Sequence, residues 1–222
     1  MAIEQQQYQR KLQAALDRHQ VLLKEVNHRV KNSLQVVSAM LQLQANAADD
    51  QALGEQLNEA ASRVNAVGRA YERLTYNADY ENIDLIAYLR EIVGDLRPTV
   101  APCEIEFDAR EAIQFAADRA ILVGLIINEL VSNAGKHAYP DRPSGKIWVR
   151  VLLQSDKQTI LISVRDEGVG FPAGYDLTTS RRLGTRLVNA LSKQLGGELT
   201  LPTSPLGTKF TLLIPLGPAT TT

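Results

Sequence analysis

The chain contains a single cysteine, Cys103, among its 222 residues, so it cannot form an internal disulfide. It has no purely apolar run near the roughly 20 residues needed to cross a bilayer. It also has no basic start followed by an apolar core and a cleavage site. We therefore expect a cytoplasmic protein without membrane insertion. Its formal net charge of -1 argues against a general attraction to nucleic acid, which needs a clustered cationic surface.

Proline and glycine are absent from residues 4–46, where Gln, Lys, Leu, Ala and Glu dominate, all of which favour helices. Apolar side chains recur there mostly in steps of three and four, which predicts a long helix. They are Leu12, Leu16, Leu23, Val26, Val30, Leu34, Val37 and Leu41. A break follows at residues 46–50, where an aspartate can cap a second helix.

The second helix is predicted by an alternation of four and three residues, which is typical of a coiled-coil or bundle seam. The seam residues are Leu53, Leu57, Ala60, Val64, Val67, Tyr71 and Leu74. Two helices joined by a short turn form an antiparallel hairpin, which cannot enclose its own apolar stripe. We therefore expect a homodimer in which two hairpins form a four-helix bundle. The alternative is that the hairpin packs on the rest of its own chain.

The pattern changes to mixed α/β near residue 79, so we expect domains at 1–78 and 79–216 and a disordered tail at 217–222. Strands are predicted at 83–85, 104–107, 113–115, 147–153, 159–164, 198–201 and 209–214, and helices at 87–96, 119–137 and 183–195. Asp118 is expected to cap the middle helix, and Gly196 with Gly197 to end the last one. Helices with an antiparallel-type sheet predict an α+β fold whose second domain is a two-layer α/β sandwich.

His28 lies two positions beyond Val26 and so points away from the apolar stripe, since a helix turns about 100° per residue. A solvent-exposed imidazole beside Arg29, Lys31 and Asn32 is placed to attack a phosphoryl group. The alternative is a solvated polar face of the helix that carries an incidental histidine.

Glu129 and Asn133 are four residues apart and share one face of the predicted middle helix. With a cation at Lys136, their oxygens suit magnesium held together with the phosphates of a nucleotide. The alternative is an exposed helix face on which such residues are common.

The segment Asp166-Glu167-Gly168-Val169-Gly170 directly follows an apolar strand. Glycines there let the backbone approach a ligand, and a carboxylate can accept a hydrogen bond from an exocyclic amine. A tight turn is the alternative. Gly184 opens the last helix near Arg181, Arg182 and Arg186, and free N–H groups at a helix start suit phosphate. An ordinary helix start with a solvated basic turn is the alternative there.

Taken in order, these segments resemble the histidine kinases of two-component signalling, in the subfamily whose phosphoacceptor box reads His-Arg-Val-Lys-Asn. The matching segments are the phosphoacceptor box His28–Asn32, the N box Asn128–His137, the G1 box Asp166–Gly170, the G2-like turn Leu183–Leu187, and the closing Gly196–Glu198 and Gly207–Phe210. The resemblance implies a dimerising phosphotransfer hairpin followed by a Bergerat-type (GHKL) ATP-binding sandwich.

The activity implied by the resemblance is that of an ATP-dependent protein histidine kinase that uses ATP and Mg²⁺. His28 would accept the γ-phosphoryl group, Asn133 would coordinate magnesium, and Glu129 would position or activate the metal site. Many histidine kinases have an acidic residue just after the phosphoacceptor, where this chain has Arg29. Glu25, one turn earlier on the same face, could orient the imidazole instead.

The nucleotide contacts implied by the resemblance come from the second domain. Asp166 would read the adenine amino group, with Thr208 beneath the base. The backbone at Gly168, Gly170 and Gly184 would follow the nucleotide. The side chains of Lys136, His137 and Arg182 would contact phosphate. The stretch between Gly170 and Gly184 is short and lacks a second glycine-rich loop, so only a compact lid could cover ATP.

The expected output partner is a response-regulator receiver domain, and the input is expected from an upstream sensor protein or domain. Two alternatives remain open. One is a phosphotransfer protein of the same architecture that does not use ATP and relays phosphate between receiver domains through His28. The other is a switch that docks a regulator through its helical hairpin, with His28 incidental.

Overall fold

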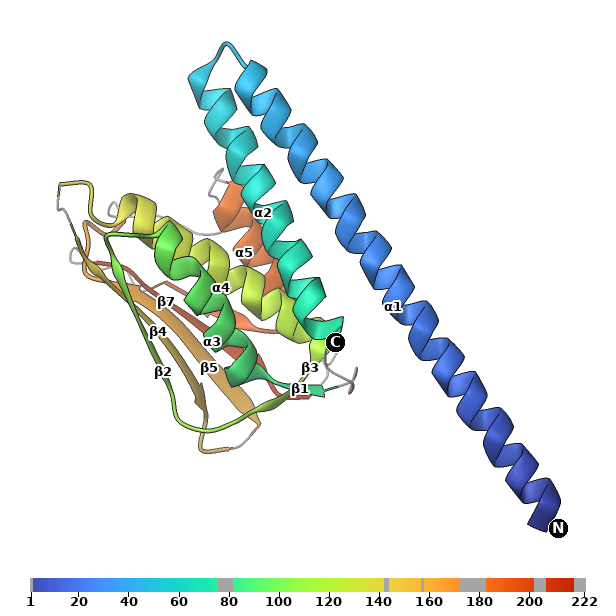
Figure 1. Cartoon of the computed structure of the whole chain (residues 1–222). Helices are drawn as coiled ribbons and strands as arrows, with labels where there is room; N and C mark the ends of the chain where they lie inside the picture. Colours follow the sequence, from blue (N-terminus) through green and yellow to red (C-terminus); the bar gives the residue numbers. More distant parts are fainter. Residues whose placement is uncertain are drawn as a thin grey trace. The chain divides into compact units, whose positions relative to one another are not determined.

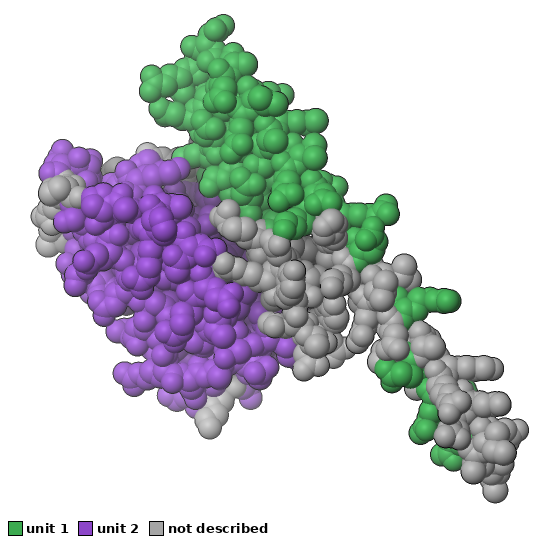
Figure 2. Space-filling model, viewed as in Figure 1, with its two compact units in different colours: residues 1–78 green, residues 79–222 purple. Residues whose placement is uncertain are grey.

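The computed structural model describes residues 2–75, 82–141, 144–156, 158–171, 183–201 and 207–217. It leaves out the side chains of residues 2–4, 6–7, 10–12, 14–17, 19–24, 27–28, 69–75 and 183. Contacts divide the chain into two compact units, residues 1–78 and 79–222, which Figure 2 shows in green and purple. The first unit is helical and the second combines helices and strands.

The first unit is an antiparallel hairpin of two helices, α1 (Ala2–Ala47) and α2 (Gln51–Thr75) (Figure 1). At the start of α2, a side-chain oxygen of Asp50 accepts the N–H of Ala52 at 2.9 Å. Asp50 therefore caps α2, which confirms the aspartate cap predicted at this break. With 46 residues against 25, α1 continues well beyond the end of α2.

Small residues form the seam between α1 and α2. Buried Gly54, Ala61 and Gly68 follow one another at seven-residue intervals along α2, and Ser38 and Ala45 show the same interval on α1. The Ser38 hydroxyl donates to the Ala61 carbonyl oxygen at 3.2 Å across the seam. A Cβ atom at residue 54 would lie 3.1 Å from the Ala45 carbonyl oxygen, so the two backbones approach closely.

Several large apolar residues of the hairpin are exposed in the single chain, while others, such as Leu34 and Val64, are half-buried. The exposed ones are Tyr8, Val26, Val36, Val37, Met40 and Leu43 on α1 and Leu53 on α2. Val26, Val37 and Leu53 belong to the predicted stripes, and their exposure in a single chain agrees with the expectation that one hairpin cannot enclose its own apolar stripe. The small residues let the two helix backbones approach closely, and these larger side chains stay outside the contact. An apolar surface of the hairpin is therefore uncovered.

The second unit contains a five-stranded sheet in the order β2-β4-β5-β7-β6 and a two-stranded sheet of β1 and β3. The strands are β1 (Asn82–Asp84), β2 (Glu104–Ala109), β3 (Gln114–Ala116), β4 (Lys146–Leu153), β5 (Thr159–Asp166), β6 (Glu198–Thr200) and β7 (Lys209–Pro215). The helices are α3 (Leu85–Leu96), α4 (Ala117–His137) and α5 (Leu183–Gln194), with a 3-10 turn at Arg97–Thr99. These three α-helices cover one face of the larger sheet (Figure 1). The predicted fold class, a helical hairpin followed by a two-layer α/β sandwich, is confirmed.

The larger sheet is mixed, and the prediction of an antiparallel-type sheet is wrong at one edge. β2 pairs with β4 in parallel, from Glu104 beside Lys146 to Ala109 beside Val151. The pairs β4–β5, β5–β7 and β6–β7 are antiparallel. α4 lies between β2 and β4 in the chain and provides the long crossover that a parallel pair requires.

The core of the second unit lies between the helices and the larger sheet. Buried and more exposed residues alternate along β4, as expected of a strand with one covered face. Phe115, Leu89, Ile127 and Ile147 are among its largest fully buried side chains, and they come from β3, α3, α4 and β4. Burying each such side chain stabilises the fold by roughly 1.5–3 kcal/mol. Elements far apart in the chain are thus fixed around α4.

α3 begins two residues earlier than predicted because Asp84 caps it. A side-chain oxygen of Asp84 accepts the N–H of Ile86 at 2.9 Å and that of Ala87 at 3.3 Å. The preceding strand consequently ends at Asp84, and Leu85 belongs to the helix.

The predicted cap of α4 by Asp118 is wrong. Ala116 occupies the N-cap position and makes no side-chain cap hydrogen bond. The Asp118 carboxylate accepts the N–H of its neighbour Arg119 at 2.8 Å instead. β3 ends at Ala116, so the helix follows the strand directly and starts at Ala117.

Arg119 fastens the start of α4 to two later segments. Its guanidinium donates to the carbonyl oxygens of Leu195 at 3.1 Å, Pro215 at 2.8 Å and Leu216 at 3.0 Å, and to that of Gly217. The predicted disordered tail was to begin at residue 217, but the carbonyl of Gly217 is held by this contact. The rest of that tail, residues 218–222, lies outside the described residues.

α5 ends as the sequence predicted. Gly196 has a φ of 65°, a conformation that side-chain-bearing residues rarely adopt. Its N–H donates to the Lys193 carbonyl and that of Gly197 to the Ser192 carbonyl, both at 2.9 Å. This pair of hydrogen bonds is the Schellman arrangement, which closes a helix and turns the chain toward the next strand, here β6.

Residues 76–81, which hold the predicted domain boundary, and residues 172–182, which hold the predicted lid and Arg182, lie outside the described residues. Within the described helices, none has the length and apolar character needed to span a membrane.

Candidate functional site

The N box predicted from the sequence occupies the C-terminal half of α4. Asn128 and Glu129 are buried, Asn133 is half-buried, and Lys136 and His137 are exposed in the last turn. Glu129 and Asn133 lie one helical turn apart, which places their carboxylate and amide groups on the same side of α4. The polar residues of the N box are therefore buried in the middle of α4 and exposed in its last turn.

Asp166 is the last residue of β5, and its side chain is held in place by backbone groups. The residue is only 6% exposed. Its carboxylate oxygen Oδ1 accepts the N–H of Gly168 at 3.0 Å and that of Thr208 at 3.1 Å. Burial raises the pKa of Asp166, while the hydrogen bonds from Gly168 and Thr208 act in the opposite direction. The structure therefore presents a buried carboxylate with a fixed orientation.

The residues directly before β7 form a second wall of this site. Buried Thr208 exchanges backbone hydrogen bonds with Asp166, whose N–H reaches the Thr208 carbonyl at 2.9 Å. Gly207 has a φ of 77°, and its N–H donates to the Gly168 carbonyl at 2.8 Å. A side chain at residue 207 would overlap the Asp166 backbone, so glycine is required for this close approach.

The turn after β5 also lies directly on the end of α4. The N–H of Val169 donates to the Ala138 carbonyl at 2.9 Å. A Cβ atom at Gly168 would overlap that same carbonyl, so glycine is required there as well. The structure therefore brings the end of the N box, the G1 turn and the start of β7 into one hydrogen-bonded arrangement.

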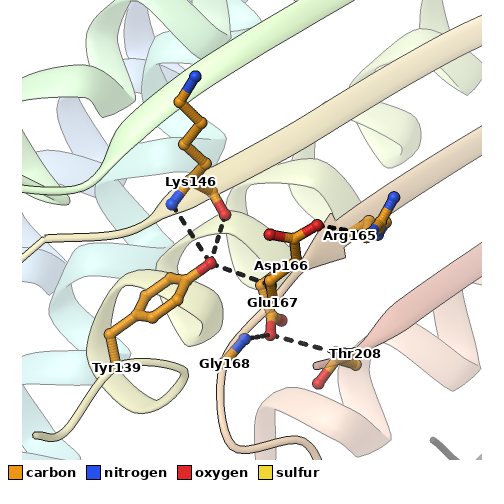
Figure 3. A network of polar contacts seen from close by, with 7 residues as sticks. All are labelled: Tyr139, Lys146, Arg165, Asp166, Glu167, Gly168 and Thr208. Atoms are coloured by element: carbon orange, nitrogen blue, oxygen red, sulfur yellow. Dashed lines mark hydrogen bonds and ion pairs between the residues drawn. The ribbon is translucent and has the colours of Figure 1, made fainter. Parts of the chain in front are cut away.

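Tyr139 belongs to this arrangement, although no sequence pattern indicated it. Its hydroxyl donates to the Lys146 carbonyl at 2.6 Å and accepts the N–H groups of Lys146 at 3.2 Å and Glu167 at 3.0 Å (Figure 3). The residue follows the N box by two positions. A buried tyrosine after a helix has no pattern that separates it from any other core tyrosine, so only the fold reveals the link.

An ion pair between Arg165 and Glu167 also holds the G1 turn. The Arg165 guanidinium pairs with the Glu167 carboxylate at 2.6 Å (Figure 3). It also lies over the Trp148 ring, 5.2 Å from its centroid. Both charged side chains are about half exposed, so the pair orients the turn more than it stabilises the fold.

The remaining predicted contacts are described only in part. Gly184 is buried and is the second residue of α5. Gly170 has a φ of 69°, which glycine adopts readily. Arg182 lies outside the described residues, so the basic residue predicted before α5 has no described position.

The phosphoacceptor box lies on α1 in the first unit. His28 is part of the helix, but its side chain is not described. Glu25 is exposed, and its Oε1 accepts the Nε–H of Arg29 at 2.8 Å. The carboxylate predicted to orient His28 therefore also pairs with the cation on the next turn.

The donor set fits a magnesium ion that shares its ligands with a nucleotide. The described residues contain no group of three or more His, Cys, Asp or Glu side chains that could hold a metal by themselves. Magnesium is commonly held by one or two protein oxygens with the rest from phosphate and water, and the amide oxygen of half-buried Asn133 on α4 is a donor of that kind.

Two family models match this chain, in the same order as the two predicted domains. Residues 25–100 match the family model described as histidine kinase. Residues 118–218 match the model described as histidine kinase-, DNA gyrase B- and HSP90-like ATPase. The chain belongs to the two-component histidine kinases with a GHKL-type ATPase domain.

Two curated histidine kinases are similar over most of this chain. The sensor histidine kinase PdtaS of Mycolicibacterium smegmatis is 32% identical over 199 residues, which cover 88% of this chain and 40% of PdtaS. Blue-light-activated histidine kinase 2 of Erythrobacter litoralis is 31% identical over 199 residues, which cover 87% of this chain and 57% of that protein. This chain thus spans only part of the length of these relatives.

A solved structure shares the fold. The EL346 blue-light activated histidine kinase of Erythrobacter litoralis aligns with a TM-score of 0.67 at 29% identity, covering 90% of this chain and 60% of that one. The histidine kinase domain of the same protein aligns with a TM-score of 0.64 at 24% identity, covering 83% of this chain and 96% of that one.

Proposed function

We propose that this chain is an ATP-dependent protein histidine kinase. Its α/β unit binds ATP, His28 takes the γ-phosphoryl group, and a receiver-domain aspartate of a response regulator takes that group from His28. The observation that carries the proposal is the hydrogen-bonded meeting of the end of α4, the Asp166–Val169 turn and the start of β7. Membership in the histidine kinase family supports it.

Asp166 is the proposed reader of adenine. Its Oδ1 already accepts two backbone N–H groups, which fix the carboxylate, and an ionised carboxylate has further sites to accept an exocyclic amine. Burial favours the neutral form of Asp166, and the two hydrogen bonds favour the ionised form that accepts. Thr208 would lie beneath the base, and the backbone at Gly168, Gly170 and Gly184 would follow the nucleotide.

The phosphate end of the nucleotide is assigned to α4 and to the start of α5. Asn133 would hold magnesium, with Glu129 one turn earlier positioning the metal site. When bound, magnesium neutralises the charge that develops on the transferred phosphoryl group. Lys136 and His137, exposed at the end of α4, and Arg182 before α5 would contact phosphate oxygens.

His28 is the proposed phosphoacceptor, and it must be a neutral imidazole to attack. We infer that Glu25 orients it, in competition with Arg29. The Glu25–Arg29 pair is exposed, and such pairs contribute little, so the carboxylate can exchange between the two partners. Glu25→Gln should slow autophosphorylation while the dissociation constant for ATP stays the same. An unchanged rate would remove Glu25 from the mechanism.

The proposed assembly is a homodimer formed through the hairpin. Supporting it is the apolar surface on α1, where Met40 is 59% and Leu43 69% exposed in the single chain. A second copy offers the same surface, and two such hairpins form a four-helix bundle. The proposed setting is the cytoplasm, with an upstream sensor protein or domain as input and a receiver domain as output.

The proposal is tested by incubating the purified chain with γ-labelled ATP and magnesium. Label should appear on the wild-type protein, and it should be absent from His28→Gln and after addition of a metal chelator. His19→Gln is the matched control, since it changes another histidine of the same helix outside the phosphoacceptor box. Label on His28→Gln would contradict the proposal.

A second arm of this experiment separates the proposal from the ATP-independent relay. If the wild-type protein takes no label from ATP but accepts phosphate from a phosphorylated receiver domain at His28, the chain is a phosphotransfer protein. If neither reaction labels His28, the histidine is incidental to function.

A further inference from the structure

The Tyr139 hydroxyl joins three segments of the α/β unit at one oxygen atom. It donates to the Lys146 carbonyl at 2.6 Å, accepts the Lys146 N–H at 3.2 Å, and accepts the Glu167 N–H at 3.0 Å (Figure 3). A phenol has one donor and two acceptor sites, so these bonds use its full capacity. The oxygen therefore links the end of α4, the start of β4 and the G1 turn.

The Tyr139 ring is held so that the hydroxyl has little freedom to move. The residue is 9% exposed. The Gly145 backbone lies against the ring, because a Cβ atom at residue 145 would overlap three of the ring carbons. A buried ring with a fixed position makes the hydroxyl a fixed point within the unit.

The Tyr139 hydroxyl holds Glu167, the residue that follows Asp166, which is the proposed contact for adenine. Glu167 lies between Asp166 and Gly168, and its N–H is the group that Tyr139 accepts. Two residues further, the Val169 N–H donates to the carbonyl of Ala138, the neighbour of Tyr139. The end of α4 thus holds the turn at alternate residues, while Thr208 holds the Asp166 carboxylate from β7.

We propose that Tyr139 is a positioning residue for adenine recognition. Its hydroxyl fixes the Asp166–Val169 turn against the end of α4, which sets the position of the Asp166 carboxylate relative to the amine of the base. This role rests on the proposed function, since it requires that the site binds a nucleotide. A purely structural role, joining β4 to α4 through Lys146, would stabilise the fold without affecting the choice of base.

The test compares ATP with inosine triphosphate, in which a carbonyl replaces the exocyclic amine that Asp166 would read. Tyr139→Phe keeps the ring and removes only the hydroxyl. Loss of one hydrogen bond of ordinary strength corresponds to a change of about 3- to 10-fold in an equilibrium constant. We expect Tyr139→Phe to weaken ATP binding by about that factor and to change inosine triphosphate binding little, so that the preference for ATP falls.

Tyr88→Phe is the matched control because it removes the hydroxyl of another buried tyrosine, whose ring lies against Gly124 in α4. It should leave the ratio of the two dissociation constants unchanged. An unchanged ratio in Tyr139→Phe would overturn the inference. An equal loss for both nucleotides together with a lowered melting temperature would also overturn it, in favour of the structural role.

Amide hydrogen exchange in the wild-type protein provides a test that needs no substitution. The Glu167 amide should exchange more slowly when ATP is bound than when inosine triphosphate is bound at equal saturation. Equal protection would overturn the inference even if Tyr139→Phe does not fold. Failure of the wild-type protein to bind either nucleotide is a different result, because it removes the proposed function and this inference with it.

Discussion

The two units of the chain bury apolar side chains of different size. Among the described side chains, the buried apolar residues of the hairpin are alanines, such as Ala45 and Ala61. The α/β unit buries large ones, such as Phe115, Leu89 and Ile127. Because burial of apolar area is the main favourable term in folding, the α/β unit contains its own stabilisation.

The hairpin differs because several of its large apolar residues, Met40 and Leu43 among them, are exposed in the single chain. Alanine and glycine let α1 and α2 approach closely, but they remove little apolar area from water. Further stabilisation has to come from another surface that covers Met40 and Leu43. The comparison therefore separates a unit that is stable through its own core from one whose stability depends on assembly.

The largest expected effect is in the core of the α/β unit. Leu89→Ala should lower the free energy of unfolding by about 2–5 kcal/mol, because Leu89 is fully buried and the substitution leaves a cavity. Val169→Ala, in the same unit but 58% exposed, should change it by less than about 0.5 kcal/mol. Urea unfolding measures both. Similar values for the two variants would contradict the conclusion that the α/β unit is stabilised by its own core.

The second prediction concerns the outward surface of the hairpin. Met40→Glu combined with Leu43→Glu should raise the dimer dissociation constant by about tenfold or more, because two charges would be buried in an apolar interface. The control is Gln42→Glu with Gln44→Glu, which adds the same charge at exposed polar positions of the same helix. Analytical ultracentrifugation measures the association. A wild-type chain that remains monomeric at high concentration would contradict the proposed dimer.

The third prediction concerns the small-residue seam. Ala61→Leu should destabilise the hairpin by about 1–3 kcal/mol, because the larger side chain forces α1 and α2 apart at the Ser38 contact. Ala52→Leu makes the same substitution at an exposed position of α2 and should have little effect. Thermal unfolding followed by circular dichroism compares the two. If Ala61→Leu is as stable as the control, the seam is not closely packed.

The smallest expected effect on stability is at the buried charge of the α/β unit. The pKa of Asp166 is raised in the folded state. Its contribution to the free energy of unfolding is therefore present below the pKa of the unfolded chain and is lost as pH rises through the raised value. Asp166→Asn removes this titration, so its stability should depend less on pH than that of the wild type. Urea unfolding from about pH 4 to about pH 8 measures the difference.

The same variant connects stability with function. Asp166→Asn should bind ATP more weakly, because an amide can donate where the carboxylate only accepts. Weaker binding without loss of stability would show that this buried charge serves recognition. Unchanged ATP binding would argue against Asp166 as the reader of adenine.

The parts of the fold that follow from local chemistry were predictable. The Asp50 cap, the Gly196-Gly197 helix end and the glycines of the G1 turn each depend on a few neighbouring residues. The site segments were predictable for the same reason, since Gly168 and Gly207 are required by close backbone contacts. The order of these segments in the chain then identified the family.

The parts that depend on distant contacts were not predictable. The parallel pairing of β2 with β4 depends on where α4 crosses the sheet, which no local pattern specifies. One apolar stripe was visible on each of α1 and α2, but periodicity does not show which residues of a stripe are buried within a single chain. The contact of Tyr139 with Glu167 joins residues 28 positions apart, so it appears only when the helix and the strand meet.

The Arg165–Trp148 stack has a practical consequence. The chain contains one tryptophan, and the cation over its ring immediately precedes the proposed adenine reader in β5. Indole emission responds to the distance of a nearby charge, and Arg165 also pairs with Glu167 in the Asp166–Val169 turn, so a nucleotide that moves this turn should alter the intrinsic fluorescence. Trp148 is therefore an intrinsic fluorescence probe, and ligand titrations can be followed without a dye.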